Sequence, residues 1–224
     1  MINQNIVGQP AAGSNNALMN GRSGALGDTI VSELHGGFYE ANYQGNIFFG
    51  GHGSLIALSA NTITLTATTT PILGLYNPSG NTKNLALNKA SLNLVANNLT
   101  SGAAPGVFVW AISVGNGSIS TGSNPYNAKT LLQSGSNAKV FAGNVALTGL
   151  TNNLTIVAGS GFTSPSGLTY GTIAGTALMP SYGGIEVFDG SLIVPPGGVL
   201  ALLNTTSSTV FSAVGRLEWE EVPV

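Results

Sequence analysis

The chain of 224 residues contains no cysteine and very little charge. Without cysteine, disulfide bridges, cysteine-based zinc sites and thiol nucleophiles are excluded. Asp, Glu, Lys and Arg together make up 6% of the residues, against roughly 25% in an average domain. Because an isolated soluble monomer normally keeps a charged surface, a chain this poor in charge fits an assembly whose neighbours cover much of it, or an exported surface protein.

The few charges do not gather in the sequence. The formal net charge is -2, and Lys83 and Lys89 are the nearest basic pair. Phosphate recognition needs several cations on one face, so we expect no nucleic-acid partner. No run approaches about 18 apolar residues, and the chain does not begin with a basic region followed by an apolar one. We therefore expect neither a membrane span nor a standard secretory signal.

What the chain does contain is enough apolar material, 43% of its residues, for the core of one large β domain. From residue 45 onward, short apolar or alternating runs are bounded by Gly, Pro, Asn and Ser, which is typical of strands and turns. The run at residues 107–114 is apolar on both faces and should be a central strand. The other predicted strands are residues 47–49, 62–66, 72–76, 85–95, 138–146, 154–158, 184–188, 191–194, 199–204 and 210–219.

Many short strands without a fixed internal repeat predict an all-β protein with an antiparallel β-sandwich, and loops of varied length favour a jelly-roll-like order. We place this domain at residues 45–224, after an N-terminal arm and lead-in segment at residues 1–44. Residues 1–24 carry little to bury, which fits an arm ordered by a partner and a free terminus equally well. Residues 28–35 fit a short helix capped by Asp28 and a strand equally well.

One predicted strand changes its buried face along its length. In residues 85–95, Leu85 and Leu87 occupy odd positions, whereas Leu92 and Leu94 occupy even ones. One extra residue reverses the face of every side chain that follows it. The pattern therefore predicts a β-bulge or bend near Lys89.

The residue types that carry out catalysis or bind metals form no recognised pattern. The two histidines, His35 and His52, lack the spacing and the third ligand of a catalytic zinc site. The glycine-rich residues 50–54 lack the lysine of a phosphate-binding loop, and no G-x-S-x-G nucleophile elbow occurs. The carboxylates have no EF-hand spacing, and nothing indicates a pair across a cleft. We predict a non-enzymatic chain with no catalytic, cofactor or metal site.

The last strand and the aromatic residues around the start of the domain are the candidate interface. The aromatic residues would either anchor a partner subunit or, as we favour, form the first core strands. Alternation places Leu217 and Trp219, with Phe211, on one side of the last strand, opposite Arg216 and Glu218. Glu218 and Glu220 share a face and would repel each other unless a cation lies nearby. Arg216, on the same face, is the expected partner. The candidate interface residues are Phe38, Tyr39, Tyr43, Phe48, Phe49, Arg216, Glu218 and Trp219.

The end of the chain resembles a known group of proteins. Residues 189–202 read as a strand, a Pro-Pro-Gly-Gly turn and a second strand that returns. This turn, the ending Leu-Glu-Trp-Glu-Glu-Val-Pro-Val at residues 217–224 and the stretch at residues 31–40 resemble small virion proteins of tailed bacteriophages. The resemblance covers the first and last thirds of the chain, and its motifs are structural. It implies a decoration or cement protein on the surface of the phage head.

The resemblance also implies the partners, which are the major capsid protein and further copies of the chain in a homotrimer. The action would be mechanical, because many weak contacts repeated around a shell give high avidity. The alternative hypothesis is a fibre module that binds a receptor or a carbohydrate. Exposed aromatic residues in loops, such as Tyr126, Tyr170 and Tyr182, would favour it. A polysaccharide-degrading enzyme is the third hypothesis.

Overall fold

The computed structural model describes residues 38–52, 56–58, 71–96, 108–115, 118–119, 122–133, 135–142, 147–148, 155–159, 182–205 and 207–224. Within it, a compact unit spans Glu40–Val224. The predicted arm, the segment at residues 28–35 and the predicted strand at residues 62–66 lie outside the described residues. The predicted boundary after residue 44 stays a prediction.

Strands dominate the described residues, as the sequence predicts. They are β1 (Ile47–Gly51), β2 (Ile56–Leu58), β3 (Leu73–Tyr76), β4 (Lys83–Ala96), β5 (Phe108–Val114), β6 (Ser118–Ile119), β7 (Tyr126–Asn127), β8 (Lys139–Phe141), β9 (Leu147–Thr148), β10 (Thr155–Gly159), β11 (Tyr182–Val194), β12 (Gly198–Asn204) and β13 (Ser208–Pro223).

A short helix that the sequence analysis did not predict, α1 (Tyr39–Gln44), precedes β1. The side-chain amide of Gln44 donates a hydrogen bond of 2.8 Å to Glu40, one turn earlier. The helix ends at Gly45, whose φ of 81° lies in the left-handed region. The N–H of Asn46 then donates to the carbonyl of Ala41 at 2.8 Å, which satisfies one of the last helical carbonyls.

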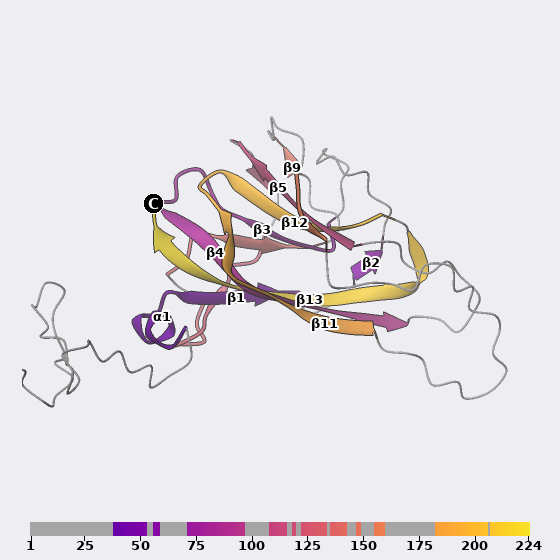
Figure 1. Ribbon diagram of the computed structural model, residues 1–224, viewed down its shortest axis with the longest axis horizontal. Helices are drawn as coiled ribbons and strands as arrows, with labels where there is room; N and C mark the ends of the chain where they lie inside the picture. Colours follow the sequence, from indigo (N-terminus) through magenta and orange to yellow (C-terminus); the bar gives the residue numbers. More distant parts are fainter. Residues whose placement is uncertain are drawn as a thin grey trace, which may run out of the picture. The chain divides into compact units, whose positions relative to one another are not determined.

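The described strands form two large antiparallel sheets and a two-stranded one, in which β6 pairs with β9. The six-stranded sheet has the order β11-β4-β13-β1-β7, with β2 also paired to β13, and the five-stranded sheet has the order β10-β5-β12-β3-β8. Figure 1 shows β5, β12 and β3 in one layer and β13, β1 and β11 in the other. The prediction of an all-β sandwich is confirmed, and β5, between β10 and β12, is central to its sheet as expected.

The order of the longer strands is that of a jelly roll. Taken in chain order, eight of the described strands are β1, β3, β4, β5, β10, β11, β12 and β13. They pair first with last, second with seventh, third with sixth and fourth with fifth, which is the pattern of one long hairpin rolled into two sheets. The observed pairs are β1 with β13, β3 with β12, β4 with β11 and β5 with β10.

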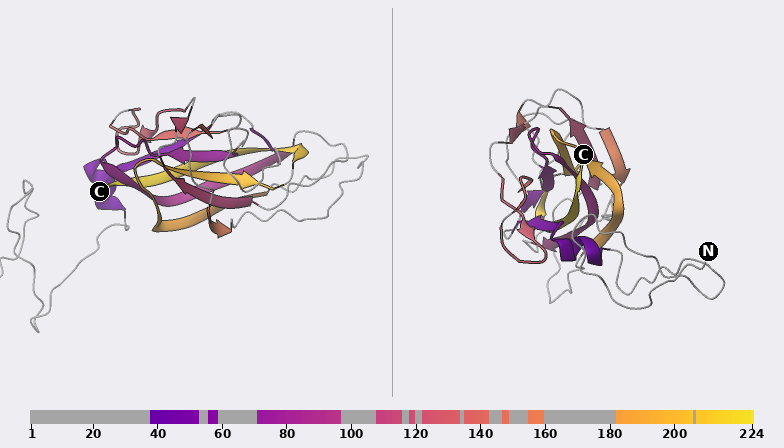
Figure 2. Two further views of the ribbon diagram at one scale, coloured as in Figure 1. Left: turned by 90° about the horizontal axis from the view of Figure 1, so that it is seen from above. Right: turned by 90° about the vertical axis from the view of Figure 1, so that its left-hand side faces the viewer.

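The main core lies between the two sheets, which overlap in the left view of Figure 2 and are seen from one end of the sandwich in the right view. Phe48 and Trp219, cross-strand partners on β1 and β13, stack with their ring centroids 6.5 Å apart. Burial of aromatic and aliphatic side chains from both sheets is the main force that holds the layers together. The largest contributors are Phe48, Leu85, Leu87, Leu92, Leu217 and Trp219 from one sheet and Leu73, Leu75, Phe108, Trp110, Leu200 and Leu202 from the other.

The predicted β-bulge in the long strand is confirmed, and Asn88 is the extra residue. On β13, Glu218 pairs with Lys89, and the next residue, Trp219, pairs with Leu87. Asn88 has no partner position, so the face reverses there. Consequently the odd-numbered leucines before the bulge and the even-numbered ones after it all point into the core.

The same bulge corrects the prediction of two strands at residues 184–194. The chain forms one strand, β11, in which Val187 pairs with Lys89 and Leu192 pairs with Leu87. The intervening residues loop out opposite the bulge of β4, and both Asp189 (φ 47°) and Gly190 (φ 76°) adopt left-handed backbone conformations. Alternation alone shows the break in the pattern but not that pairing resumes beyond it.

The Pro-Pro-Gly-Gly turn also differs from its predicted role. The strand after it, β12, belongs to the five-stranded sheet, whereas β11 belongs to the six-stranded one. The turn therefore carries the chain from one layer to the other instead of closing a hairpin. Gly197, with φ of 78°, donates its N–H to the carbonyl of Asn77 at 2.8 Å.

Candidate interaction site

Side chains of the types that bind metals or take part in catalysis are sparse among the described residues. Among the described residues, no group of three or more His, Asp or Glu side chains is placed to hold a metal ion. His52 directly follows β1, where its N–H donates to the carbonyl of Gly215 at 3.4 Å, and His35 lies outside the described residues. No described helix has the length and apolarity needed to cross a membrane.

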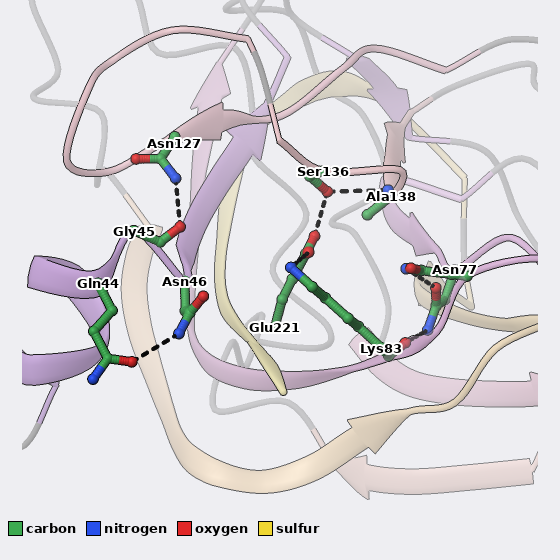
Figure 3. Close-up of polar contacts among 10 residues, drawn as sticks. Gln44, Gly45, Asn46, Asn77, Lys83, Asn127, Ser136, Ala138 and Glu221 are labelled. Carbon is green, nitrogen blue, oxygen red and sulfur yellow. Dashed lines mark hydrogen bonds and ion pairs between the residues drawn. The ribbon is translucent and has the colours of Figure 1, made fainter. Parts of the chain in front are cut away.

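A buried carboxylate lies at one end of the sandwich. Glu221, near the end of β13, forms an ion pair of 3.1 Å with Lys83 at the start of β4, and its side chain is almost fully buried. Its other oxygen accepts a hydrogen bond from the hydroxyl of Ser136, and that hydroxyl accepts one from the N–H of Ala138 at 3.0 Å. Figure 3 shows these groups converging from two strands and the segment that leads to β8. The arrangement satisfies a buried charge and fixes the last strand.

A second polar junction, at Asn77, joins the two sheets. Asn77 follows β3 of the five-stranded sheet and is fully buried. Its side-chain amide donates to the carbonyls of Lys83 and Val194, each at 2.9 Å, at the ends of two strands of the other sheet (Figure 3). Its side-chain oxygen accepts from the amide of Asn81 at 2.7 Å. Asn in a turn commonly bonds nearby backbone, but the bonds of Asn77 to the other layer had no sequence signal.

Asn127 organises the loop after β7. Its side-chain oxygen accepts from the N–H groups of Lys129 and Thr130 at 3.0 and 3.2 Å, and its amide donates to the carbonyl of Gly45 at 2.7 Å. Lys129 reaches back to α1, where it donates to the carbonyl of Tyr43 at 2.6 Å and lies 4.8 Å from the centre of that ring. The loop and the short helix are thereby held together.

Aromatic and charged side chains meet on the outer face of the six-stranded sheet. Phe49 and Tyr126 stack at 5.7 Å between ring centroids. The guanidinium of Arg216 lies 4.1 Å from the centre of the Phe49 ring, a cation–π contact. Glu218 accepts from Arg216 at 3.3 Å and pairs with Lys89 at 3.0 Å. The expected ion pair of Arg216 with Glu218 is confirmed. Lys89 is a second cation beside Glu218 that the sequence did not predict.

The candidate interface residues divide into three groups. Phe48 and Trp219 are buried in the core of their own chain, which fits the favoured core interpretation for Phe48 and leaves Trp219 without a surface for a partner. The predicted division of the last strand, with Leu217 and Trp219 opposite Arg216 and Glu218, matches the observed burial. Phe49, Arg216 and Glu218 gather on the outer face, and Tyr39 and Tyr43 are exposed on α1, directly after the half-buried Phe38.

An exposed aliphatic row on β11 had no signal in the sequence. Ile185, Val187 and Ile193 are 70%, 62% and 49% exposed, and β11 is the edge strand of the six-stranded sheet. Glu186 and Phe188, which alternate with them, point inward. There the indole N–H of Trp110 donates to Glu186 at 2.8 Å, and the ring packs edge-on against Phe188. Alternation identified this strand, but it could not distinguish an exposed apolar face from a covered one.

Comparisons with known proteins give no match to a family model, to a curated protein or to a solved structure.

Proposed function

We propose that the chain is a structural virion protein that decorates or cements the head of a tailed bacteriophage. Its partners would be the major capsid protein and further copies of itself, as a homotrimer on the surface of the shell. The observation that carries the proposal is the open outer face of the six-stranded sheet. It combines exposed aliphatic side chains on an edge strand with a prearranged Tyr–Phe–Arg stack, in a chain with very few charges. The resemblance at both ends of the chain supports the phage context.

The proposed action is mechanical. A decoration protein has to transmit load between shell subunits without deforming. The sandwich suits this because its two layers share one core and are tied at one end by the buried bonds of Asn77 and by the bond of Glu221 with Ser136, just before β8. Close-packed interiors resist compression. Each contact with the shell can then be weak, since repetition around the particle supplies the avidity.

A fibre module that binds a carbohydrate is the second candidate, and Tyr126 favours it. Its side chain is 42% exposed and stacks on Phe49 beside Arg216. Aromatic rings held in a fixed orientation with adjacent polar groups are suitable platforms for ligands. The expected loop positions are wrong for two of the three tyrosines, since Tyr126 lies on β7 and Tyr182 begins β11. Tyr170 lies outside the described residues.

The experiment that tests the proposal adds purified protein to capsids that lack it and images the particles by electron microscopy. The cement hypothesis predicts regular density at local three-fold or quasi-three-fold positions and a higher disruption temperature of the shell. A matched sample with Val187→Asp, which places a charge on the open face, should bind more weakly. Density on the tail would move the fibre hypothesis to first place, and binding to neither structure would reject the head assignment.

A further inference from the structure

We propose that the outer face of the six-stranded sheet is a self-complementary interface, at which two copies of this chain pack face to face. The two-fold axis would run parallel to the strands, between β4 and β13. This contact deepens the proposed function, because it uses the face on which that function rests and names a second copy of the chain as the molecule that covers it.

One row of directly paired positions crosses this face from edge to edge. Val187 on β11 is opposite Lys89 on β4, which is opposite Glu218 on β13, which is opposite Phe49 on β1, which is opposite Tyr126 on β7. Directly paired residues share a face. The ion pair of Lys89 with Glu218 and the stack of Phe49 with Tyr126 show that these side chains meet there. From β11 to β7, the row therefore consists of an aliphatic side chain, a cation, a carboxylate and two aromatic rings.

Rotation about the proposed axis makes this row complementary to itself. It brings β4 of each copy over β13 of the other, so that Lys89 faces Glu218 of the second copy, and this contact occurs twice. It also brings β11 over β1, so that Val187 faces the Phe49 ring. Sheets that pack face to face lie about 10 Å apart, at an angle of roughly 30°. An interface of this kind is isologous and closes as a two-fold assembly.

The neighbouring row supports the same pairing. It consists of Ile185, Ser91, Arg216 and Gly51, in the same order of strands. Under the same rotation, the 70% exposed Ile185 lies over Gly51, which has no side chain to obstruct it. Ser91 lies over Arg216, whose planar guanidinium can donate to its hydroxyl. Both rows thus pair an aliphatic side chain with an aromatic or open position and keep opposite charges or polar groups together.

The exposure of β11 supplies the driving force. Exposed aliphatic side chains aligned on a strand favour association, because burial removes them from water. β11 lies at the edge of its sheet, where β4 is its one neighbouring strand. Burial of this row against the aromatic stack of a second copy would remove apolar surface from water at both ends of the interface. The central charges would fix its register and orientation.

Charge-swap variants test the pairing between chains. Lys89→Glu gives a row with two carboxylates, and Glu218→Lys gives a row with two lysines, so each variant should repel itself and lose the two-fold contact. In an equimolar mixture of the two variants, the two substituted side chains face each other across the interface with opposite charges. The native Glu218 of the first variant likewise faces the native Lys89 of the second, so a one-to-one complex should form.

Recovery in the mixture reports the contact between chains alone, because the intrachain ion pair of Lys89 with Glu218 stays broken in both variants. Native mass spectrometry resolves the homo-oligomers of each variant from the mixed complex. A variant that fails to fold would be recognised beforehand by circular dichroism of the separate samples.

The wild-type protein should be a dimer, or a hexamer if the trimer also forms, because a two-fold contact between trimers doubles their mass. The contact is overturned if the wild type stays a monomer or a simple trimer at its highest soluble concentration, or if the charge-swap mixture gives no mixed complex. A trimer without the two-fold contact would leave the proposed head function standing, whereas a two-fold dimer that does not bind capsids would count against that function alone.

A second variant avoids any loss of folding caused by the charge reversals. Ile185→Asn should weaken the self-association by about tenfold or more, with the thermal unfolding midpoint of the dissociated chain unchanged. Leu132→Asn is the matched control, since Leu132 is 62% exposed and lies outside both rows. Equal effects of the two substitutions on association would overturn the proposed interface.

Discussion

The outer faces of the two sheets are built from the same kinds of residue but have opposite environments. On the five-stranded sheet, outward side chains form a second apolar cluster that is buried within the chain, namely Tyr76, Val109, Ala111, Phe141, Val199, Ala201 and Leu203, with Ile119 of β6 packed against it. On the six-stranded sheet, the outward aliphatic residues of β11 are exposed beside the ion pairs of Lys89, Arg216 and Glu218. One face is completed by the chain itself, and the other is available to a second molecule.

The difference follows from the position of each strand. β12 lies between β5 and β3, and each of its residues is buried. Close packing extends even to Gly74 on β3, where a side chain would collide with the ring of Phe141. β11 is an edge strand with one neighbour, β4. An apolar side chain on such a strand remains exposed unless another element or another chain covers it.

The largest difference in stability should appear when a carboxylate is introduced on the outer face of each sheet in turn. Ala201→Asp places a carboxylate in the buried outer cluster, which should cost about 4 kcal/mol or more and prevent folding. Val187→Asp makes a comparable change on the open face, where the carboxylate remains hydrated and lies near Lys89. It should fold normally. Circular dichroism and thermal unfolding of the soluble protein distinguish the two, and comparable losses would show that the open face is in fact covered.

Truncation of one aliphatic side chain on each face should give the next largest effect. Leu203→Ala leaves a cavity in the buried cluster and should lower the free energy of unfolding by about 2–5 kcal/mol. Ile185→Ala removes a side chain that is largely exposed in the single chain. At a protein concentration low enough to dissociate any dimer, it should change the free energy of unfolding by no more than about 0.5 kcal/mol. Chemical denaturation of both variants measures the difference. Similar values for the two variants would contradict the contrast between the faces.

The polar junction between the layers should give an intermediate effect. Asn77→Ala leaves the carbonyls of Lys83 and Val194 without their donor in a buried place, and it should cost about 1–3 kcal/mol. Asn93→Ala, an exposed position on the open face, is the control and should fall within about 0.5 kcal/mol of the wild type. Equal free energies of unfolding for the two variants would show that Asn77 does not tie the sheets together.

The smallest effect should come from the bulge in β4. The side-chain amide of Asn88 is buried, and neither of its polar atoms has a hydrogen-bond partner. Asn88→Ala removes this unpaired group, so stability should stay unchanged or rise by about 1 kcal/mol. Its unfolding curve can be compared directly with that of the wild type. A clear loss of stability would indicate that the amide has a partner in solution.

Much of the fold could be predicted because alternation records burial along each strand. The sandwich, the central strand at residues 107–114 and the bulge beside Lys89 all followed from the spacing of apolar residues. Sequence order does not record which strands become neighbours. The two predicted strands at residues 184–194 therefore proved to be one, and the Pro-Pro-Gly-Gly turn proved to cross between layers.

The candidate site was predicted less completely, for a related reason. Arg216 and Glu218 are two residues apart on one strand, so their contact was visible in the sequence. Lys89, by contrast, reaches Glu218 from a distant strand. Trp219 was predicted as an interface residue. It lies two residues after Leu217, however, so alternation already placed its side chain on the core face of the strand. The exposed row on β11 depends on an edge position that only the sheet order reveals.

The most direct test of the account is a high-resolution electron microscopy reconstruction of the protein bound to capsids that lack their own copies. The account predicts regular density in which Ile185, Val187 and the Phe49–Tyr126 stack lie against another chain, while the outer cluster of the five-stranded sheet stays enclosed within its own chain. Particles without added density, or bound copies whose six-stranded sheet faces solvent, would contradict it.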